Sequence, residues 1–157
     1  MASSAITIYN KAKLNLLNAT DILNGTSTNW YLALVTSAYT PSAGDAGHEV
    51  WADVSANEIA NGNGYVTNGG NLTSVALSGP ASGVIKFTSA AFVWNATGTG
   101  IPAWRYGVIV YRGTLNSKVN PLLGYFTGDS TPADIPLTTS GNTLTFTPNA
   151  SGILTLT

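Results

Sequence analysis

The sequence contains no cysteine, a single histidine and few charged residues. Among 157 residues there are six lysines and arginines and seven aspartates and glutamates, so the net charge is −1 and charged residues make up 8%. The absence of cysteine excludes disulfides, thiol nucleophiles and thiolate metal sites. Six cations are too few to form the basic stripe of a nucleic-acid-binding protein. We therefore expect no nucleic-acid partner.

Long apolar runs are also missing. The longest, such as 108–111, fit a strand, whereas a membrane-spanning helix needs about 20 apolar residues. The first residues lack a basic segment ahead of an apolar one, and Asn10, Lys11 and Lys13 interrupt the apolar pattern. We therefore expect neither a membrane association nor a secretory signal.

Threonine, serine and asparagine are plentiful from end to end, and they provide the surface polarity that charged residues do not. A nearly neutral surface of this kind favours association between protein molecules. The length corresponds to one domain, which buries enough surface to fold without a metal or a disulfide. We expect a single domain, residues 1–157, that belongs to an assembly.

One helix is predicted near the start, over about residues 5–19. The apolar residues that recur there at helical spacing are Ala5, Tyr9, Ala12, Leu16 and Ala19. Ser3 or Ser4 is placed to cap the helix, and Asn24-Gly25 closes the segment after it. We expect its apolar stripe to pack on a sheet or on a neighbouring subunit.

After this helix the apolar pattern changes to the period of a strand. In 30–35 the alternate residues Trp30, Leu32 and Leu34 point one way and the residues between them the other, so both faces are expected to be covered. A turn-rich loop follows over about 38–70, where Ser55 and Glu58 form a capping box that predicts a short helical turn.

From residue 72 the chain is divided into short strands by turn residues. The predicted strands are 72–77, 83–88, 91–94, 104–112, 121–127, 134–138, 143–147 and 153–157. Without alternating crossover helices, a parallel sheet is excluded. The fold class is therefore all-β, an antiparallel β-sandwich or jelly-roll-like domain with one short N-terminal α-helix.

The last predicted strand contains Ile153, Leu154 and Leu156 and stops at the final residue of the sequence. An uncovered strand edge promotes aggregation. We expect this strand either to lie inside a sheet or to pair with another subunit.

Only one group of residues combines the histidine with acidic side chains: Asp45, His48, Glu49 and Asp53. These types can ligate a divalent cation or act as an acid–base pair. The spacing matches no metal-binding motif, and the chain has no Gly-x-Ser-x-Gly elbow and no phosphate-binding loop. We therefore interpret the group as a solvated loop, and expect no enzyme activity, no catalytic residue, no metal and no cofactor.

The aromatic residues are the remaining candidates for binding. Trp30, Trp94, Trp104 and Tyr106 lie in or beside predicted strands and are expected to pack in the core. Trp51 lies in the loop, where it can anchor an interface, stack on a sugar, or hold the loop on its own domain. Arg105, between two aromatic residues, is expected to stack and form hydrogen bonds.

The order of several segments resembles a widespread group of small virion structural proteins of tailed bacteriophages. Over about 11–125, the segments that carry the resemblance are 11–17, 30–35, 48–53, 58–59, 64–65, 69–73, 92–94 and 104–106. The resemblance brings no catalytic residues. It implies a capsid or tail component made in the bacterial host cytoplasm, and a single all-β domain of this kind looks like a capsid decoration (cement) protein on the capsid surface. Its implied partners are the major capsid protein and copies of itself.

Two alternatives remain open. In the first alternative the chain is a tail or neck component. In the second it is a carbohydrate- or receptor-binding module in which Trp51 stacks on a host surface glycan. The contact elements are expected to be the N-terminal helix, the 38–70 loop and the last strand. The candidate interface residues are Tyr9, His48, Trp51, Ile153, Leu154 and Leu156.

Overall fold

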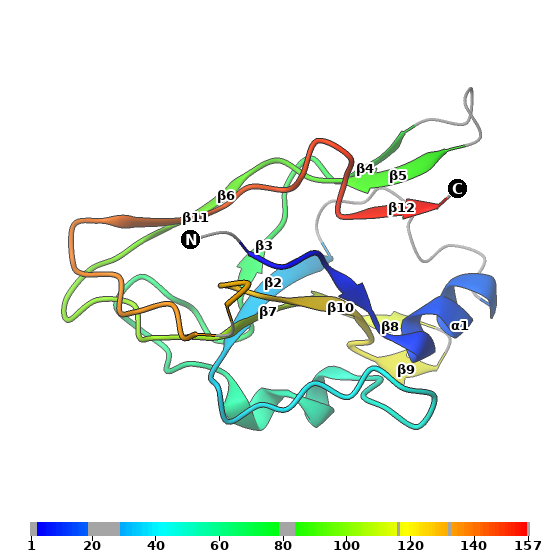
Figure 1. Cartoon of the computed structure of the whole chain (residues 1–157), viewed down its shortest axis with the longest axis horizontal. Helices are drawn as coiled ribbons and strands as arrows, with labels where there is room; N and C mark the ends of the chain where they lie inside the picture. The colour runs from blue at the N-terminus through cyan, green and yellow to red at the C-terminus, as the bar shows by residue number, and fades with distance from the viewer. Residues whose placement is uncertain (1–2, 19–28, 79–83, 116, 132, 157) are drawn as a thin grey trace.

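The computed structural model describes residues 3–18, 29–78, 84–115, 117–131 and 133–156. The predicted fold class is confirmed: the chain is mostly antiparallel β-structure in a sandwich-like arrangement, with one short α-helix. Figure 1 shows an upper β layer above a lower sheet, and a loop with short helical turns beneath that sheet.

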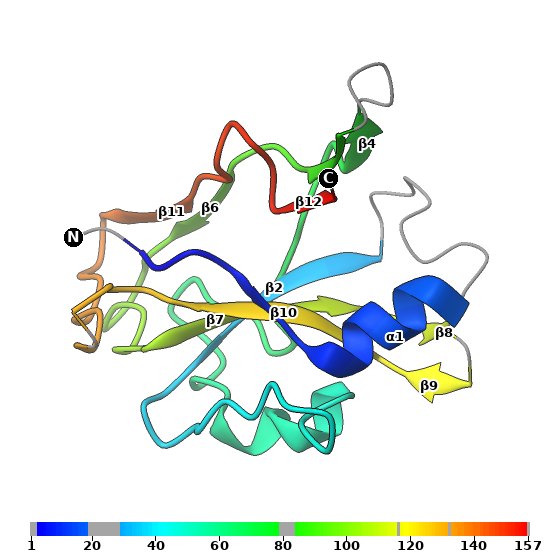
Figure 2. The ribbon, with the colours of Figure 1, turned by 45° about the vertical axis from the view of Figure 1, so that its right-hand side comes forward.

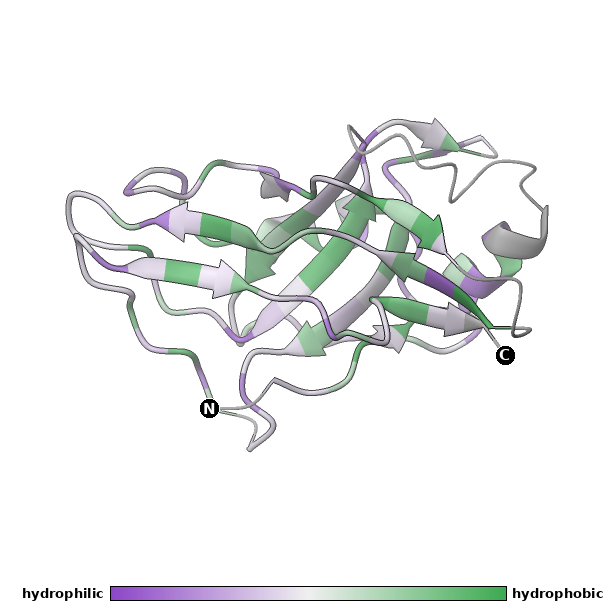
Figure 3. Ribbon diagram, turned by 90° about the horizontal axis from the view of Figure 1, so that it is seen from above, coloured by the Kyte–Doolittle hydropathy of each residue, from purple (hydrophilic) through white to green (hydrophobic). Residues whose placement is uncertain are grey.

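The lower sheet has five antiparallel strands and contains the most buried part of the chain. Their order across the sheet is β1 (Thr7–Ile8), β10 (Leu122–Thr127), β7 (Tyr106–Tyr111), β2 (Trp30–Val35) and β3 (Gly70–Asn71). Both β2 and β7 are buried along most of their length, and Figure 3 shows the central strands as largely hydrophobic. These two strands are covered on both faces, which explains why polar residues do not alternate along them.

The upper layer is a long ribbon with one added strand. It consists of β4 (Ala76–Ser78), β5 (Ile85–Thr88), β6 (Phe92–Asn95), β11 (Thr143–Phe146) and β12 (Leu154–Leu156). β6 pairs with β11 and β5 with β12, while β4 pairs with the other edge of β5. A separate hairpin of β8 (Thr114–Leu115) and β9 (Lys118–Val119) lies near the helix (Figure 2).

Aromatic rings seated on glycines bring parts of the fold into close contact. Phe92 lies over Gly70, Phe126 over Gly107, and Trp104 over Gly128, in each case closer than a Cβ atom would allow. Each glycine thus provides room that no other residue leaves. The layers are also joined by stacking of Phe126 on Phe146, with ring centroids 5.5 Å apart, and by edge-to-face contact of Trp30 with Phe87 at 5.1 Å.

The loop after β2 covers the other face of the lower sheet. It contains two short helical turns, η1 (Trp51–Asp53) and η2 (Ser55–Asn57). Isolated bridges tie it to the sheet at Val35–Glu58 and at Val50–Pro121. The helical turn expected here is confirmed, but the capping box is wrong. Glu58 instead accepts hydrogen bonds from the Tyr65 hydroxyl and from the backbone N–H of Asn68, at 2.7 and 2.6 Å.

The helix is shorter than predicted: α1 spans Asn10–Asn18. The preceding residues pair with β10, and Ser4 is not a helix cap. Its backbone N–H donates to the Thr127 carbonyl, and its hydroxyl accepts from the Thr127 backbone N–H. The predicted stripe is confirmed at the buried Tyr9 and Ala12 and is wrong at Ala5, which is exposed. The side chain of Leu16 and residues Ala19, Asn24 and Gly25 lie outside the described part of the chain.

Two predicted strands differ from the structure. Residues 134–138 form only the isolated bridges Trp104–Ile135 and Ile101–Thr138. In the predicted strand 72–77, Leu72 is buried, but it follows β3 and precedes β4 in the chain and belongs to neither strand. The last strand, β12, lies at the edge of the order β12-β5-β4, so the expectation that it lies inside a sheet is wrong. Pairing with another subunit stays a prediction.

Candidate interaction surface

The acidic residues around the histidine separate toward different partners. Asp45 accepts a hydrogen bond from the Asn10 amide at 2.8 Å, and Glu49 forms an ion pair with Lys118 at 3.1 Å. Asp53 accepts from the backbone N–H groups of Glu49 and Val50, at 2.8 and 3.0 Å. Within the described ranges, no three potential metal ligands come together. These side chains therefore order the loop and its contact with α1.

His48 ends a chain of hydrogen bonds that begins under the lower sheet. The hydroxyl of Tyr9 is hydrogen-bonded to that of Tyr39, which lies 2.9 Å from Nδ1 of His48. Burial raises the pKa of Tyr9 far above its usual value and that of Tyr39 to about 12. Both tyrosines are thus neutral near pH 7. Tyr9, a candidate interface residue, is fully buried, and the hydrogen-bonded chain holds the start of α1 against the loop.

Trp51 lies against its own domain. It is buried, and the Arg112 guanidinium lies 4.6 Å from its ring centroid and 5.8 Å from that of Tyr31. Nη2 of Arg112 also donates to the Asn68 carbonyl at 2.6 Å. Burial lowers the pKa of Arg112 from its usual value. Cation–π attraction and this hydrogen bond therefore hold the loop in place, and little of the Trp51 ring is free to stack on a sugar.

Arg112 is a residue that sequence reasoning missed. Arg105, the cation singled out between aromatic residues, forms an ion pair with Asp134 at 2.7 Å near the surface. The other aromatic predictions are confirmed for Trp30, Trp94 and Trp104, which are buried in the core. Arg112 directly follows the last residue of β7, and this position beside Tyr111 is the only local sign of its role.

The end of the upper layer carries exposed apolar side chains beside strand edges that no described strand covers. Leu77 lies opposite Phe87 across β4 and β5, and Ile85 is two residues before Phe87, so the three share one face. Phe87 is buried, but Leu77 and Ile85 are 46% and 41% exposed. No described strand pairs with the outer edge of β4 or of β12. We call Leu77, Ile85 and these two edges the end patch.

The candidate interface residues of the last strand contribute unequally to this patch. Ile153 is buried, and Leu154 is partly buried against the core. Leu156 belongs to β12, but its side chain lies outside the described part. The backbone of β12, rather than the side chains of Ile153 and Leu154, is what this strand presents at the sheet edge.

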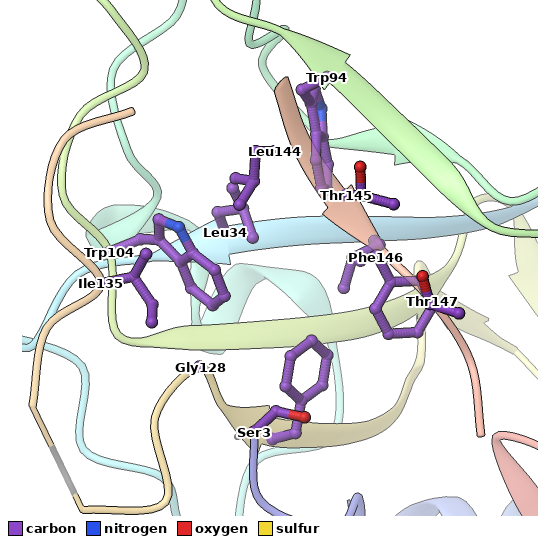
Figure 4. Close-up of a pocket in the computed structure, with 12 residues that line it drawn as sticks. Ser3, Leu34, Trp94, Trp104, Gly128, Ile135, Leu144, Thr145, Phe146 and Thr147 are labelled. Carbon is purple, nitrogen blue, oxygen red and sulfur yellow. The ribbon is translucent and has the colours of Figure 1, made fainter. Parts of the chain in front are cut away.

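A cavity of about 380 Å³ lies between the two layers, away from the end patch (Figure 4). Its walls include Leu34 and Phe126 from below, Leu144, Phe146 and Trp94 from above, and Trp104 at one end. The ring N–H of Trp104 is buried and has no hydrogen-bond partner among the described residues. An unpaired buried donor costs about 1–3 kcal/mol, and this nitrogen is packed inside the wall of the cavity rather than exposed to its open space.

Comparison with known proteins adds no relative: no protein-family model, curated protein or solved structure matches the chain. None of the described helices is long and apolar enough to span a membrane.

Proposed function

We propose that the chain is a non-enzymatic structural protein of a tailed-bacteriophage virion. Specifically, we propose a capsid decoration protein that bridges and stabilises neighbouring major capsid subunits on the capsid surface. The observation that carries the proposal is the end patch, where two exposed apolar side chains lie beside two strand edges that no described strand pairs with. The resemblance of segments between residues 11 and 125 to small virion proteins supports the same role.

The end patch has the properties of an association surface. Free strand edges offer unpaired N–H and C=O groups to another chain, and natural monomers usually protect such edges with charge, proline or a covering loop. Here the residues of β4 are all exposed and uncharged, and Lys86 on the central strand is the one charge on the described strands of this three-stranded unit. Burial of Leu77 and Ile85 by a partner would remove their apolar surface from water, which favours association.

The sparse charge of the whole chain supports the same conclusion. With 8% charged residues, there is little like-charge repulsion to keep copies apart in a crowded lattice. The acidic side chains of the loop are engaged in local hydrogen bonds or an ion pair, as described above. A role in assembly needs a rigid scaffold and a complementary surface, and it needs no reactive group.

The test is binding of the purified chain to capsids from which decoration has been stripped, measured by co-sedimentation. We expect the double variant Leu77→Lys/Ile85→Lys to lose binding, because two charges would be buried in the contact. Val66→Lys/Val119→Lys is the matched control, since both valines are more exposed, at 64% and 63%, and lie outside the end patch. It should bind as the unchanged chain does, and both variants should keep the circular dichroism spectrum of the folded protein.

Copy number in purified virions separates decoration from the alternatives. We expect hundreds of copies per particle, removed by mild denaturant to leave fragile heads. A few copies that stay with the tail would replace the proposal with a tail or neck role. Undiminished binding of Leu77→Lys/Ile85→Lys to stripped capsids would show that the end patch is not the contact.

A further inference from the structure

We propose that Tyr9, Tyr39 and His48 form an acid-sensitive latch between the start of α1 and the loop after β2. When His48 takes up a proton, one of the two buried tyrosine hydroxyls loses its hydrogen-bond acceptor and the latch loosens. The latch belongs to the lower part of the fold and the end patch to the upper layer (Figure 1), so the inference does not rest on the proposed role in assembly.

The latch joins two segments that are distant in the sequence. Tyr9 directly precedes α1, whereas Tyr39 and His48 belong to the loop. The Tyr9 hydroxyl is hydrogen-bonded to that of Tyr39, which lies 2.9 Å from Nδ1 of His48. Beside this chain of hydrogen bonds, the backbone N–H of Asn10 donates to the Ala43 carbonyl at 3.1 Å. The chain is therefore part of the contact by which the loop holds the first turn of α1.

The number of protons fixes the direction of the two hydrogen bonds. Burial raises the pKa of each tyrosine, so each hydroxyl keeps its proton. In the described ranges neither hydroxyl has a hydrogen-bond partner outside this chain. Both hydroxyls can donate only if Tyr9 donates to Tyr39 and Tyr39 donates to Nδ1 of His48, which must then be the unprotonated nitrogen. Neutral His48 accordingly carries its proton on Nε2.

Protonation of His48 leaves three protons for two hydrogen bonds. The imidazolium ring donates from both nitrogens, so Nδ1 no longer accepts from Tyr39. Whether the ring stays or turns away, one tyrosine hydroxyl proton has no acceptor in the chain. Tyr9 and Tyr39 are 0% and 2% exposed, so solvent does not readily replace that acceptor. The unfolded chain takes up the same proton without this cost, so the contact weakens as the pH falls through the usual range of histidine, about pH 6.5.

Charged groups around the latch change its strength but not the proton count. Nearby carboxylates favour a protonated histidine by Coulomb attraction, but each of them already has a hydrogen-bond or ion-pair partner. The ionisable groups around the chain of hydrogen bonds are Asp45 and Glu49 of the loop, Asp53 of η1, Tyr106 of β7, Tyr125 of β10, Lys13 of α1 and Lys118 of β9.

The first test needs no variant. His48 is the only histidine in the sequence, so the two ring nitrogens in a ¹⁵N spectrum need no assignment. We expect the proton of the neutral ring on Nε2. The second test compares the hydrogen-exchange protection of the Asn10 and His48 amides near pH 8 and near pH 5, each corrected for the intrinsic exchange rate at that pH. Amides of β6 and β11 are the reference, because a local latch leaves the upper layer unchanged.

Three variants separate the latch from ordinary packing. Tyr39→Phe disconnects His48 from the buried hydroxyl of Tyr9, and His48→Asn retains an acceptor near the position of Nδ1 but takes up no proton. Tyr9→Phe is the matched control, since it also removes one buried hydroxyl but leaves the Tyr39 proton dependent on His48.

On acidification, protection should fall about fivefold to thirtyfold more in the unchanged chain and in Tyr9→Phe than in Tyr39→Phe or His48→Asn, because only the first two lose an acceptor. The inference is overturned if neutral His48 carries its proton on Nδ1. It is also overturned if the fall is equal in the unchanged chain and in either uncoupled variant that folds, or if Tyr9→Phe abolishes it.

Discussion

Replacing Gly107 with alanine tests how tightly the Phe126 ring is packed between its neighbouring strand β7 and Phe146 of the upper layer. The added Cβ would lie 2.3 Å from Cζ of Phe126 and 2.5 Å from Cε1, well inside contact distance. The backbone of β7 cannot withdraw, because it is paired with β2 on one side and β10 on the other. Phe126 cannot rise freely either, since Phe146 stacks on its ring.

The expected magnitude follows from two opposing effects. Inserting a methyl group into a well-packed core costs about 1–3 kcal/mol. Replacing glycine with alanine at a permitted backbone conformation returns about 0.4–1 kcal/mol through the unfolded chain. Gly107 does not have a positive φ, so no backbone strain adds to the cost. We expect a net loss of about 1–2 kcal/mol in the free energy of unfolding, and a fall in Tm of about 2–8 °C.

Urea unfolding followed by circular dichroism measures this loss. Gly44→Ala is the matched control, because nothing lies within 4 Å of the added atom and its φ is not positive. It should leave stability unchanged or slightly higher. In Gly107→Ala/Phe126→Leu the smaller side chain makes room, so the combined loss should be smaller than the sum of the single losses. A Gly107→Ala variant as stable as the Gly44→Ala control would refute the close packing of Phe126 between Gly107 and Phe146.

Two further predictions concern the face beneath the lower sheet. Stability should fall as the pH rises above 10, the usual pKa of tyrosine, toward the pKa of about 12 that burial gives Tyr39, because ionisation is easier in the unfolded chain. At about 1.4 kcal/mol per pKa unit, the loss of unfolding free energy attributable to Tyr39 approaches about 3 kcal/mol. The urea midpoints near pH 8 and near pH 11.5 should therefore differ less in Tyr39→Phe than in the unchanged protein. Equal differences in the two proteins would contradict this prediction. Arg112→Met should cost about 1–3 kcal/mol and speed hydrogen exchange over 50–58, whereas Arg105→Met, which breaks an exposed ion pair, should cost about 0–1 kcal/mol. Equal losses in these two variants would show that the Trp51–Arg112 contact does not hold the loop.

The parts of the fold that the sequence predicts well are those with a strong local pattern. The uninterrupted apolar stretch of β2 identified both the strand and its burial on two faces. β7 and β10 were bounded by turn residues and were placed within about two residues of their observed ends. In these segments the side-chain period and the flanking turns agree, so no distant contact is needed to identify the strand.

The parts that failed depend on distant partners. The helix was predicted to begin near residue 5 because Ala5 continues the periodic stripe, but pairing of Ser4 with Thr127 holds that segment as an extended edge. Periodicity over a short window contains no information about a partner more than a hundred residues away. The small hairpin of β8 and β9 was missed because two-residue strands show no period.

The candidate sites were predictable to different degrees. The spacing around His48 predicts no metal or acid–base site, and the structure shows the separate partners of Asp45, Glu49 and Asp53. The end patch was foreseen only in its β12 part, because the exposure of Leu77 and Ile85 depends on how far β4 and β5 extend past the core. The cavity could not be foreseen at all. Its walls come from several separate segments, and the unpaired Trp104 donor is recognised only once its neighbours are placed.

The position of β2 in the lower sheet has a consequence for synthesis of the protein. Its longest pairing is with β7, and residues 36–105 separate the two strands in the chain. A ribosome that adds about 5–20 residues per second needs between about 4 and 14 s to cover that distance. During this time six consecutive apolar residues have emerged without their principal neighbour, which exposes the nascent chain to misassembly. Growth temperature and chaperone supply during synthesis should therefore affect the yield of native protein.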